Sequence, residues 1–570
     1  MAILPQPSRW ILAERHQEVE DNLVEALGIP SVVAALLAQR GISDPAEAHK
    51  FLHPSLSDLH SPELLPDYQA AKDEILGARE RGDLIFIHGD YDVDGVTSAA
   101  ILHRFLSKVG AEVKSHVPHR MKEGYGINLS AVEQAKQLGA KLFLTCDCGI
   151  SAHVQVEAAK EAGMRVVVTD HHAVGSDLPE AHAVVNPHRI DSEYPFAELS
   201  GAGVVFKLCA GLSRELGHGV DNFYRAYLDL AALGTIADVM PLYDENRIIA
   251  KFGLERIEET NKAGLQALKA VANVNPPLRT YHVGFQLGPR INAVGRMDDS
   301  DLALRLLLEN DYAEAMKLAL EIDTYNVERK DAQQKMIDEA IEMVESKELH
   351  NNYVIAVAHP DWHSGIVGLV AGRLVERYNR PAFCFVIDEA RGIYKGSARS
   401  IPAFSLIDAI RNFPDLIEGG GHTMAAGCAF KISDFENVTK LLDEFARSIL
   451  KPEDLAPAYA ADLEVDADAL TLAVMEQVAM LEPFGNSNPE PIFIARNLDL
   501  TSIKPTRNPA HVQLQFRGQA GSIVAASGFN MATRFAESRP GQKVDLLFKP
   551  EIDTYSGRRV KWNLKDFTEC

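Results

Sequence analysis

Apolar and polar positions alternate in a repeated strand-then-helix pattern between about residues 84 and 187. Apolar runs that end in polar clusters, such as LIFIHGD, KLFLTCD and RVVVTDH, alternate with amphipathic stretches such as VTSAAILHRFLSKVG and SAHVQVEAAKEAG. A short apolar run predicts a buried strand, and an amphipathic stretch predicts a helix that covers the sheet. Repeated units of this kind predict an α/β domain with a mostly parallel sheet and helices on its faces.

The pattern changes in the remainder of the chain. Helical periodicity dominates from 201 to 348 and includes a charge-rich stretch, residues 311–346, that predicts a long connecting helix. A second, smaller α/β pattern runs from Tyr353 to about Leu450. The prolines and acids of KPEDLAPAYAADLEVD predict a linker, and alternating runs such as HVQLQF and KVDLLF after it predict a small antiparallel barrel or sandwich.

These changes predict five segments in order. A small helical cap is expected at 1–75, where we can interpret no motif, and the parallel-sheet domain is expected at 76–300. The connecting helix is expected at 301–350, the smaller α/β domain at 351–455 and the all-β domain at 456–570. A chain of 570 residues has room for several such domains.

The composition favours a cytoplasmic location. No stretch approaches the roughly 18 uncharged apolar residues that cross a bilayer, and the opening MAILPQPSRW lacks the layout of a signal peptide. We therefore expect a cytoplasmic protein with no membrane partner. Six scattered cysteines form neither a disulfide framework nor a paired CxxC zinc site, which suits a reducing compartment.

Charge is distributed unevenly along the chain. The formal net charge of −23 argues against a polyanionic partner, because phosphate backbones are bound chiefly by Lys and Arg. From Pro491 to Cys570, however, twelve Lys and Arg stand against seven Asp and Glu, which gives +5 there and −28 in residues 1–490. An acidic body could bind cations while a basic C-terminal module holds an anionic polymer. The alternative is a chance drift in composition.

The most specific chemical feature is the run HGDYDVDG from His88 to Gly95, which lies where the first strong strand should end and a helix begin. Its three carboxylates, Asp90, Asp92 and Asp94, would repel one another unless cations or protons compensate. An EF-hand loop fits the first ligand positions, but position 12 is Ile101 rather than Glu, and a strand rather than a helix precedes the run. A solvated acidic turn is the other alternative.

Two further strands are expected to end in metal-type ligands. Asp147 closes KLFLTCD, and the triplet Asp170-His171-His172 closes the strand that begins RVVV. The carboxyl ends of parallel strands lie along one edge of a sheet, where ligand sites form. Oxygen ligands mixed with imidazole favour Mn²⁺ or Mg²⁺ over zinc, and a carboxylate shared by two cations about 4 Å apart suits phosphodiester hydrolysis. Strand alternation turns Cys146 and Cys148 away from this edge, so we interpret both as core residues.

At this point the chain closely resembles the DHH phosphoesterase superfamily, named for the run seen here as Asp170-His171-His172. Within it the match is to the single-strand-specific 5′→3′ DNA exonucleases of bacteria. The similar blocks follow in order from about residue 80: HGDYDVDG, PHRMKEGYG, TCDCGIS, VTDHH, LGTIADVMPL, GPRINAVGRM, WHSGIVG, KGSARS, GGGHTMAAG and EPFGNSNPEP. The resemblance implies a DHH catalytic domain, a long connecting helix, a DHHA1 domain over the cleft and an OB-fold that guides single-stranded DNA.

The resemblance also assigns ligands for two ions, Mn²⁺ or Mg²⁺. One ion would be held by Asp92 and Asp147, with His88 or Asp90 beside them. The other would be held by Asp94, Asp147, His171 and Asp238, so that Asp147 bridges the pair. The role of Asp238 depends on the LGTIADV block alone, because the sequence by itself suggests only a helix end.

The remaining catalytic residues implied by the resemblance are His172 and Asp170. His172 would contact the scissile phosphate, and Asp170 would orient the histidine pair. The alternative for His172 is that it only orders its neighbours.

An end-reading pocket is implied as well. Arg120, Ser397 and Arg399 would hold a terminal 5′-phosphate, for which a guanidinium fork is well suited. Tyr125 would stack on a base near that end. Contacts with the DNA or with the cleft are implied for Arg290, Arg296 and His422. Ordinary surface charge is the alternative for the arginines, and a structural turn is the alternative for the histidine.

Together these features predict a metal-dependent exonuclease that grips single-stranded DNA by its 5′ end and releases 5′-mononucleotides, in DNA repair and recombination. One alternative is a relative that acts on small substrates, which the basic C-terminal module disfavours. Another is a non-catalytic DNA-binding relative, which the complete ligand set disfavours. The resemblance further implies a partner, the acidic tail of single-stranded DNA-binding protein, and we expect the enzyme to be a monomer.

Overall fold

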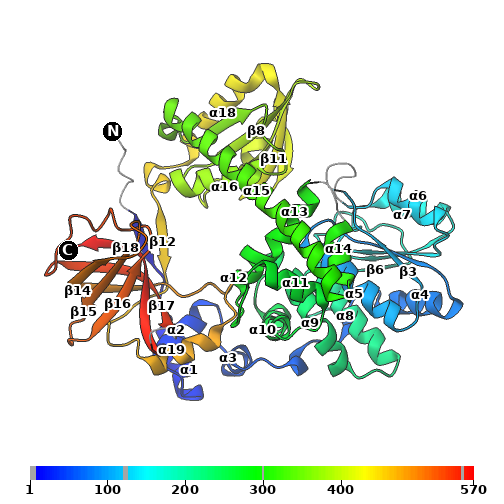
Figure 1. Ribbon diagram of the computed structural model, residues 1–570, viewed down its shortest axis with the longest axis horizontal. Helices are drawn as coiled ribbons and strands as arrows, with labels where there is room; N and C mark the ends of the chain where they lie inside the picture. The colour runs from blue at the N-terminus through cyan, green and yellow to red at the C-terminus, as the bar shows by residue number, and fades with distance from the viewer. Residues whose placement is uncertain (1–7, 120–125, 298–300, 554–556) are drawn as a thin grey trace. The chain divides into compact units, whose positions relative to one another are not determined.

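The computed structural model describes residues 8–119, 126–297, 301–553 and 557–570 (Figure 1). The chain forms two compact units, each made of two stretches of sequence. The larger unit is Ala13–Asn326 with Asp462–Cys570, and the smaller unit is Met1–Leu12 with Val327–Ala461. No helix in the described part of the chain has both the length and the apolar character needed to cross a membrane.

A five-stranded parallel sheet is the centre of the larger unit. Its order is β3-β2-β4-β5-β6. The strands are β2 Ile85–His88, β3 Val113–His116, β4 Leu142–Cys146, β5 Arg165–Thr169 and β6 Ala183–Val185. The chain moves to one side of β2 to form β3 and then to the other side to form β4. The carboxyl ends of β2 and β4 therefore flank the point at which the strand order reverses, where α/β sheets bind ligands.

Helices cover both faces of this sheet, which is why its strands read as continuous apolar runs. Along β4, Leu142, Leu144 and Cys146 pack into one hydrophobic core, whereas Phe143 packs into the core on the opposite face. Helices of the first face include α4 Tyr68–Arg81, α5 Val93–Lys108, α8 Gly201–Glu215 and α9 Val220–Ala237. Helices of the second are α6 Leu129–Gln137 and α7 His153–Glu161. Cys146 and Cys148 are buried in these cores, as predicted.

Further helices extend the first face. They are α10 Asp244–Glu258, α11 Ala263–Val271, α12 Thr280–His282, the π-helical turn η3 Val283–Leu287, α13 Gly288–Met297, α14 Asp301–Leu308 and α15 Tyr312–Ser346. The long helix predicted at 311–346 is confirmed as α15, whereas the wider segment expected at 301–350 also contains the separate helix α14. Between them the Glu309 carboxylate accepts the backbone N–H groups of Asn310 and Asp311, and the Asp311 carboxylate caps α15 by accepting the N–H of Glu314 at 2.9 Å.

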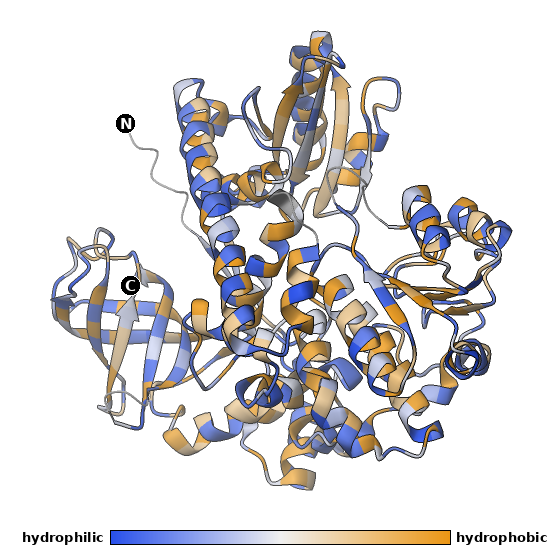
Figure 2. Cartoon of the chain, turned by 45° about the vertical axis from the view of Figure 1, so that its right-hand side comes forward, coloured by the Kyte–Doolittle hydropathy of each residue, from blue (hydrophilic) through white to orange (hydrophobic). Residues whose placement is uncertain are grey.

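The C-terminal part of the larger unit is a closed β-barrel. Its strands are β13 Leu463–Glu464, β14 Phe493–Pro505, β15 Val512–Arg517, β16 Ile523–Gly528, β17 Lys543–Asp553 and β18 Arg559–Glu569, and pairing of β14 with β17 closes it. Buried and exposed residues alternate along β15, and the barrel strands show this alternation as orange and blue bands in Figure 2. The barrel is not wholly antiparallel, because β16 and β18 pair in parallel.

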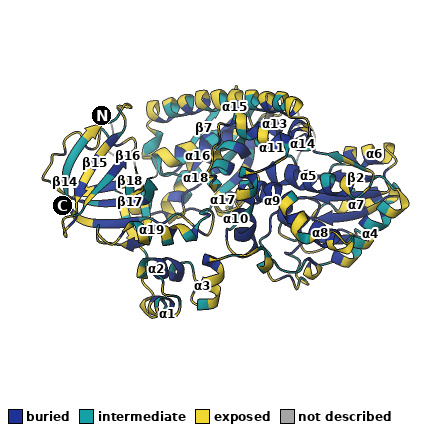
Figure 3. Cartoon of the chain, turned by 60° about the horizontal axis from the view of Figure 1, so that its bottom comes forward, coloured by how far each residue is buried: buried dark blue, intermediate teal, exposed yellow. Residues whose placement is uncertain are grey.

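The N-terminal helices share a core with this barrel. These helices are α1 Gln17–Leu27, α2 Ser31–Gln39 and α3 Pro45–Leu52, which Figure 3 labels together with the barrel's own helix α19 Leu472–Val478. Leu23 of α1 and Leu36 of α2 belong to the same hydrophobic cluster as Phe493 and Phe548 of the barrel. The helices therefore do not form a separate cap at 1–75, and the boundary expected at 75 falls inside α4.

The smaller unit contains a mixed sheet in the order β10-β11-β9-β8-β7. Its strands are β7 Ile355–His359, β8 Ala382–Asp388, β9 Ile393–Arg399, β10 Glu418–Gly421 and β11 Ala425–Lys431. One face packs against α16 Val367–Tyr378 and the second half of α15, and the other packs against α17 Leu406–Arg411 and α18 Phe435–Ile449. Cys384 and Phe383, neighbours on β8, point to these opposite faces.

The stretch expected to be a linker is ordered. Strand β12, Ala458–Ala461, pairs in parallel with β1, Arg9–Leu12, and β13 pairs with β14. Pairing with segments distant in sequence overrides the local preference of prolines and acids for a loop. Short 3-10 turns lie at Leu56–Asp58, Pro62–Leu64, Leu349–Asn351, Ile432–Asp434, Pro452–Leu455 and Ala479–Leu481.

One buried guanidinium links three segments of the larger unit. Arg247 of α10 is 2% exposed. It donates hydrogen bonds to the carbonyl oxygens of Phe51 in α3 and of Met480, Leu481 and Glu482, at distances of 2.8 to 3.0 Å. Burial lowers the pKa of Arg247 to about 9, so its charge has a desolvation cost that these carbonyls offset.

We expect Arg247→Leu to lower the free energy of unfolding of the larger unit by about 3 kcal/mol or more, because four carbonyl oxygens lose a buried donor. Arg247→Lys should have an intermediate effect, since an ammonium can reach only part of this set. Calorimetry measures the change, with Lys251→Leu, one turn further along α10, as the control. An unfolding temperature of Arg247→Leu equal to that of the control would contradict the role.

Candidate metal centre

Three carboxylates lie at the carboxyl edge of the parallel sheet. Asp90 follows β2, Asp147 follows β4 directly, and Asp170 follows β5 directly. Asp147 has a left-handed backbone, with φ of 60°, a conformation that Asp tolerates better than most residues. A Cβ atom at Gly201, the first residue of α8, would come within 2.6 Å of the Asp147 Cβ, so this position requires glycine.

The loop after β2 presents two more carboxylates. Asp92 is the N-cap of α5, and its side chain accepts the N–H groups of Asp94 and Gly95. The Asp94 carboxylate accepts the N–H groups of Gly201 at 2.6 Å and Ala202 at 2.9 Å, both in the first turn of α8. The positive end of the α8 dipole therefore faces a buried carboxylate.

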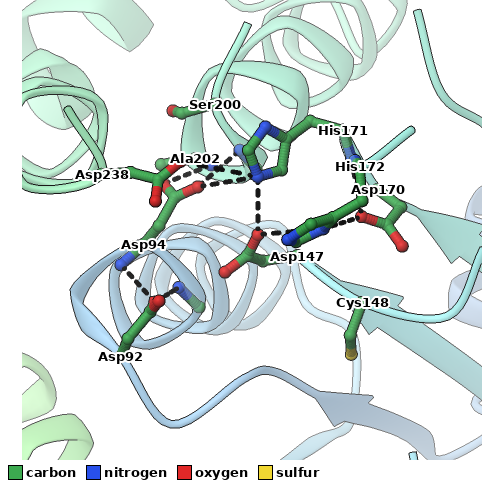
Figure 4. Close-up of polar contacts among 12 residues, drawn as sticks. Asp92, Asp94, Asp147, Cys148, Asp170, His171, His172, Ser200, Ala202 and Asp238 are labelled. Carbon is green, nitrogen blue, oxygen red and sulfur yellow. Dashed lines mark hydrogen bonds and ion pairs between the residues drawn. The ribbon is translucent and has the colours of Figure 1, made fainter. Parts of the chain in front are cut away.

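These groups converge on His171, as Figure 4 shows. Its Nε2 atom lies 3.1 Å from Oδ1 of Asp147, 3.6 Å from Oδ2 of Asp238 and 3.8 Å from Oδ2 of Asp94. Asp238 is the C-cap residue of α9, so a helix end delivers it to the edge of the sheet.

Three overlapping groups of side chains in the described part of the chain have the spacing to hold a metal ion. In each group one ligand atom per residue lies within 4.8 Å of the others. The groups are Asp90, Asp92 and Asp147; Asp94, His171 and Asp238; and Asp147, His171 and His172. Asp147 and His171 thus each belong to two of the groups.

Burial makes these carboxylates unfavourable neighbours without a cation. Burial, and then the charge of Asp92, raise the pKa of both Asp90 and Asp94 to about 7. Burial, and then the charge of Asp94, raise the pKa of Asp238 to about 8 and that of Asp147 well above its usual range. Buried Oδ1 atoms of Asp90 and Asp147 accept no hydrogen bond from any described residue. This donor set fits hard divalent cations such as Mg²⁺ or Mn²⁺.

The pKa values of the two histidines are shifted in opposite directions. Burial, and then the neighbouring His172, lower the pKa of His171 to about 4, which keeps it neutral and able to act as a ligand. Burial works against the charge of His172 as well, but the hydrogen bond to Asp170 outweighs it and raises the pKa of His172. The His172 side chain is 42% exposed, whereas that of His171 is 8% exposed.

Asp170 has an orienting position. Its Oδ1 atom accepts from the N–H groups of His171 and His172 and lies 2.7 Å from Nδ1 of His172. Its Oδ2 atom accepts the N–H of Ile150 at 2.8 Å. Burial alone would raise the pKa of Asp170, but the hydrogen bonds from His172 and the backbone hold it below its usual range. Both oxygens therefore have protein donors.

His88 is the one predicted ligand that belongs to none of the three groups. It is fully buried at the end of β2, and its Nε2 atom lies 3.3 Å from the Gly126 carbonyl oxygen. Its ring also stacks near Phe143, with 5.9 Å between centroids. The choice between His88 and Asp90, which the resemblance leaves open, therefore stays a prediction.

The residues expected to contact DNA are only partly described. Arg120 and Tyr125 lie outside the described residues, and Arg296 lies on α13 without a described side chain. Arg290 is 11% exposed, lies 2.8 Å from Asp323 of α15 and donates to the Gln286 carbonyl. Its observed partners are therefore within the protein.

The other predicted contacts lie in the smaller unit. Ser397 and Arg399 are two residues apart on β9 and thus share one face of the sheet. Both approach Gly368 in the first turn of α16: a Cβ there would lie 3.2 Å from Nη2 of Arg399 and 3.4 Å from Cβ of Ser397. His422 lies in the exposed turn between β10 and β11, and its N–H donates to the Ala425 carbonyl.

The sequence analysis did not identify several residues that position the site. Ser200 caps α8 by accepting the N–H of Gly203, and Asn292 of α13 accepts the N–H of Val93 at the start of α5. The Nδ1 atom of His188 lies 2.6 Å from the His171 carbonyl oxygen. Ser200 could have been predicted as a helix N-cap, because it precedes three small residues at the start of a helical pattern. Asn292 and His188 could not have been predicted from local sequence, because their hydrogen-bond partners Val93 and His171 are remote in sequence.

Comparison with known families matches this architecture segment by segment. Residues 84–235 match the DHH family, N-terminal domain, residues 350–448 match the DHHA1 domain, and residues 461–566 match the RecJ OB domain. The fold and site thus define a DHH-family protein that carries DHHA1 and OB domains.

Full-length relatives narrow this class. The chain is 39% identical over 560 residues to the single-stranded-DNA-specific exonuclease RecJ of Bacillus subtilis (strain 168), with 98% of this chain and 70% of the relative covered. It is 34% identical to the same protein of Salmonella typhimurium, with 96% and 97% covered. The crystal structure of RecJ in complex with Mn²⁺ from Thermus thermophilus has a TM-score of 0.83 at 29% identity, covering 99% of this chain and 80% of that one. The chain belongs to the RecJ family.

The raised pKa values predict how metal-free protein responds to pH. Asp90, Asp94 and Asp238 ionise near pH 7 to 8 when folded but near pH 4 when unfolded, so the native state holds more protons in between. Stability of the metal-free protein should therefore fall as pH rises from about 4 to 8. Mn²⁺ should raise the unfolding temperature more at pH 8 than at pH 5.

Thermal unfolding in a chelator, with and without Mn²⁺ afterwards, measures this response. Asp238→Asn should flatten the pH dependence of the metal-free protein, whereas Asp191→Asn, an exposed carboxylate paired with Arg189, should leave it unchanged. A metal-free stability that rises over this pH range would show the assignment to be wrong.

Proposed function

We propose that this chain is a metal-dependent exonuclease specific for single-stranded DNA, which acts from the 5′ end and releases 5′-mononucleotides during DNA repair and recombination. The observation that carries the proposal is the convergence of Asp94, Asp147 and Asp238 on His171, in a chain whose full-length relatives are single-stranded-DNA-specific exonucleases. Burying so many ionised acids together is unfavourable unless cations compensate their charge.

Two ions, Mn²⁺ or Mg²⁺, fit the donor set. One would be held by Asp92 and Asp147 with His88 or Asp90 beside them, and the other by Asp94, Asp147, His171 and Asp238. A pair of such cations supplies activation of water and neutralisation of the charge on the phosphate and its leaving oxygen. Related RecJ crystal structures contain Mn²⁺ and Mg²⁺.

The chain's own contribution begins with His172. Its half-exposed imidazole, whose pKa is raised by the hydrogen bond to Asp170, would face the scissile phosphate and donate a hydrogen bond to it. Asp170 would fix the direction of that ring, because both of its own oxygens are already held by protein donors. Asp147 would keep its carboxylate in place through the rigid left-handed turn against Gly201.

Recognition of the 5′ end would depend on Arg399 and Ser397. Both side chains approach the first turn of α16, where backbone N–H groups favour an anion. Burial lowers the pKa of Arg399, and its guanidinium donates only to its neighbour Ala398 among described residues. The resemblance assigns Arg120 and Tyr125 to recognition of the same 5′ end, with Tyr125 stacked on a base.

The barrel would bind the single-stranded DNA beyond the active site. Seven of its twelve Lys and Arg residues form ion pairs with described carboxylates. The five others form no ion pair in the described chain: Lys504, Arg507, Arg517, Arg539 and Lys565. These uncompensated cations suit a DNA backbone or the acidic tail of single-stranded DNA-binding protein. We further propose that the enzyme is a cytoplasmic monomer.

Asp147→Asn should reduce exonuclease activity by at least ~10³ in Mn²⁺, because both metal sites lose their shared ligand. Asparagine keeps the size of the side chain and tolerates the left-handed backbone, so folding should persist. Hydrolysis of 5′-labelled single strands measures the change, and binding to the strand should largely remain. Near-normal turnover, relative to Asp191→Asn as the control, would refute the shared role of Asp147.

Arg399→Ala should shrink the preference for 5′-phosphorylated over 5′-hydroxyl single strands by roughly tenfold, because one charge-assisted contact of ~1.5–3 kcal/mol is lost. Competition between the two substrates in one reaction measures this ratio directly. The matched control is Arg391→Ala, an exposed arginine before β9 in the same unit. A preference that persists in full in Arg399→Ala would mean that another residue reads the phosphate.

A further inference from the structure

A second polar pocket, of about 600 Å³, lies at the other end of two helices that build the metal centre. Asp94 stands at the start of α5, and the pocket is lined by Lys108, the last residue of that helix. Arg225, near the start of α9, lines the pocket, whereas Asp238 ends that helix at the metal centre. At 1.5 Å per residue, roughly 20 Å of helix separate the two sites.

The charge of this pocket is opposite to that of the chain. Its lining contains five basic residues and one acid, a formal charge of +4 in a protein of −23: Arg104, Lys108, Arg225, Arg256 and Lys262 against Asp229. Two other large pockets of the same unit have formal charges of −2 and zero. A local positive field is therefore specific to this concave surface.

Part of this charge has a structural role. Lys262 lies 2.8 Å from both oxygens of Asp229, so this pair is neutral. Arg104 is held by Leu307 O at 2.8 Å, Asn310 Oδ1 at 3.1 Å and Glu309 O at 3.2 Å. All three acceptors are uncharged, so Arg104 is fixed in position without an ion pair to any described carboxylate, although Asp229 and Glu309 act on it from further away. Burial lowers its pKa but leaves it far above neutrality for a guanidinium.

Other donors of the pocket have no acceptor. Lys108 and Arg225 are exposed and form no hydrogen bond or ion pair with any described residue. Arg256 pairs with Glu259 through Nη1 at 3.1 Å, but its buried Nε has no described acceptor. Ser107 and Asn261 add uncharged hydrogen-bonding groups to the lining. The pocket thus offers several N–H donors that a multiply charged acceptor could satisfy.

We propose that this pocket binds a small anion with two or more phosphate groups, such as a nucleoside di- or triphosphate. Guanidinium forks match phosphate oxygens, and more than one negative charge is needed to balance Arg104, Lys108 and Arg225. A DNA strand fits less well. It would continue through the adjoining pocket, whose lining contains no Lys or Arg other than Lys108 to bind its phosphates. The proposal does not depend on the exonuclease function.

Isothermal titration of inorganic pyrophosphate into the full-length protein tests this site, with a chelator present so that bound metal cannot retain the ligand. Wild type should bind, and Lys108→Ala/Arg225→Ala should bind at least tenfold more weakly, because two unpaired cations are lost. Both side chains are exposed, so the variant should fold. Lys136→Ala/Lys141→Ala makes the same charge change on exposed positions outside the pocket and should match wild type.

Two results would overturn the proposal. Equal affinity of all three proteins for pyrophosphate would place the anion elsewhere, for example at Arg399. Absence of pyrophosphate binding, combined with weaker binding of a 12-nucleotide single strand by Lys108→Ala/Arg225→Ala alone, would assign the pocket to the DNA path. Because the measurement is of direct binding, it stands whether or not the protein proves to be an exonuclease.

Discussion

Mutual repulsion of buried carboxylates at one edge of a sheet is the constraint on which the structure depends. Asp94 and Asp147 have almost no contact with solvent, and Asp90 and Asp238 raise the local negative charge further. Backbone N–H groups in the first turn of α8 offset part of this cost by donating hydrogen bonds to Asp94. Glycines make room for the carboxylates, because a Cβ at Gly201 would collide with Asp147 and one at Gly234 would collide with Asp94. Cations must supply the remainder, so the fold is preorganised for them.

The sequence predicted most of this site because its ligands follow strands that end in a recognisable way. Apolar runs before Asp90, Asp147 and Asp170 predicted three neighbouring strand ends, and parallel pairing brings such ends together. Asp238 could not be derived in this manner, since it closes a helix whose direction depends on packing. The left-handed backbone at Asp147 could not be predicted either, because the residue itself is neither glycine nor asparagine, although Gly149 follows two positions later.

Predictions of the fold failed where distant segments meet. The acidic, proline-containing stretch near 451–466 has the composition of a loop, yet β12 pairs with β1 about 450 residues away. The parallel pairing of β16 with β18 and the break at Glu309 had no periodic signal either. Local composition does not predict hydrogen bonds between distant strands. Strands joined by short turns can be predicted from the alternation of apolar and polar residues along them.

The shared core of the N-terminal helices and the barrel changes how the chain must be divided. Leu23 and Leu36 are fully buried against a cluster that includes Phe493, so the first and last parts of the larger unit stabilise one another. Arg247 ties the same two parts to the body through carbonyls of Phe51 and Leu481. Removing the barrel together with residues 480–482 would therefore uncover apolar surface on α1 and α2 and leave the buried Arg247 with the Phe51 carbonyl alone among these four acceptors. A surface proposed to hold DNA is in this way built into the stability of the catalytic unit rather than appended to it.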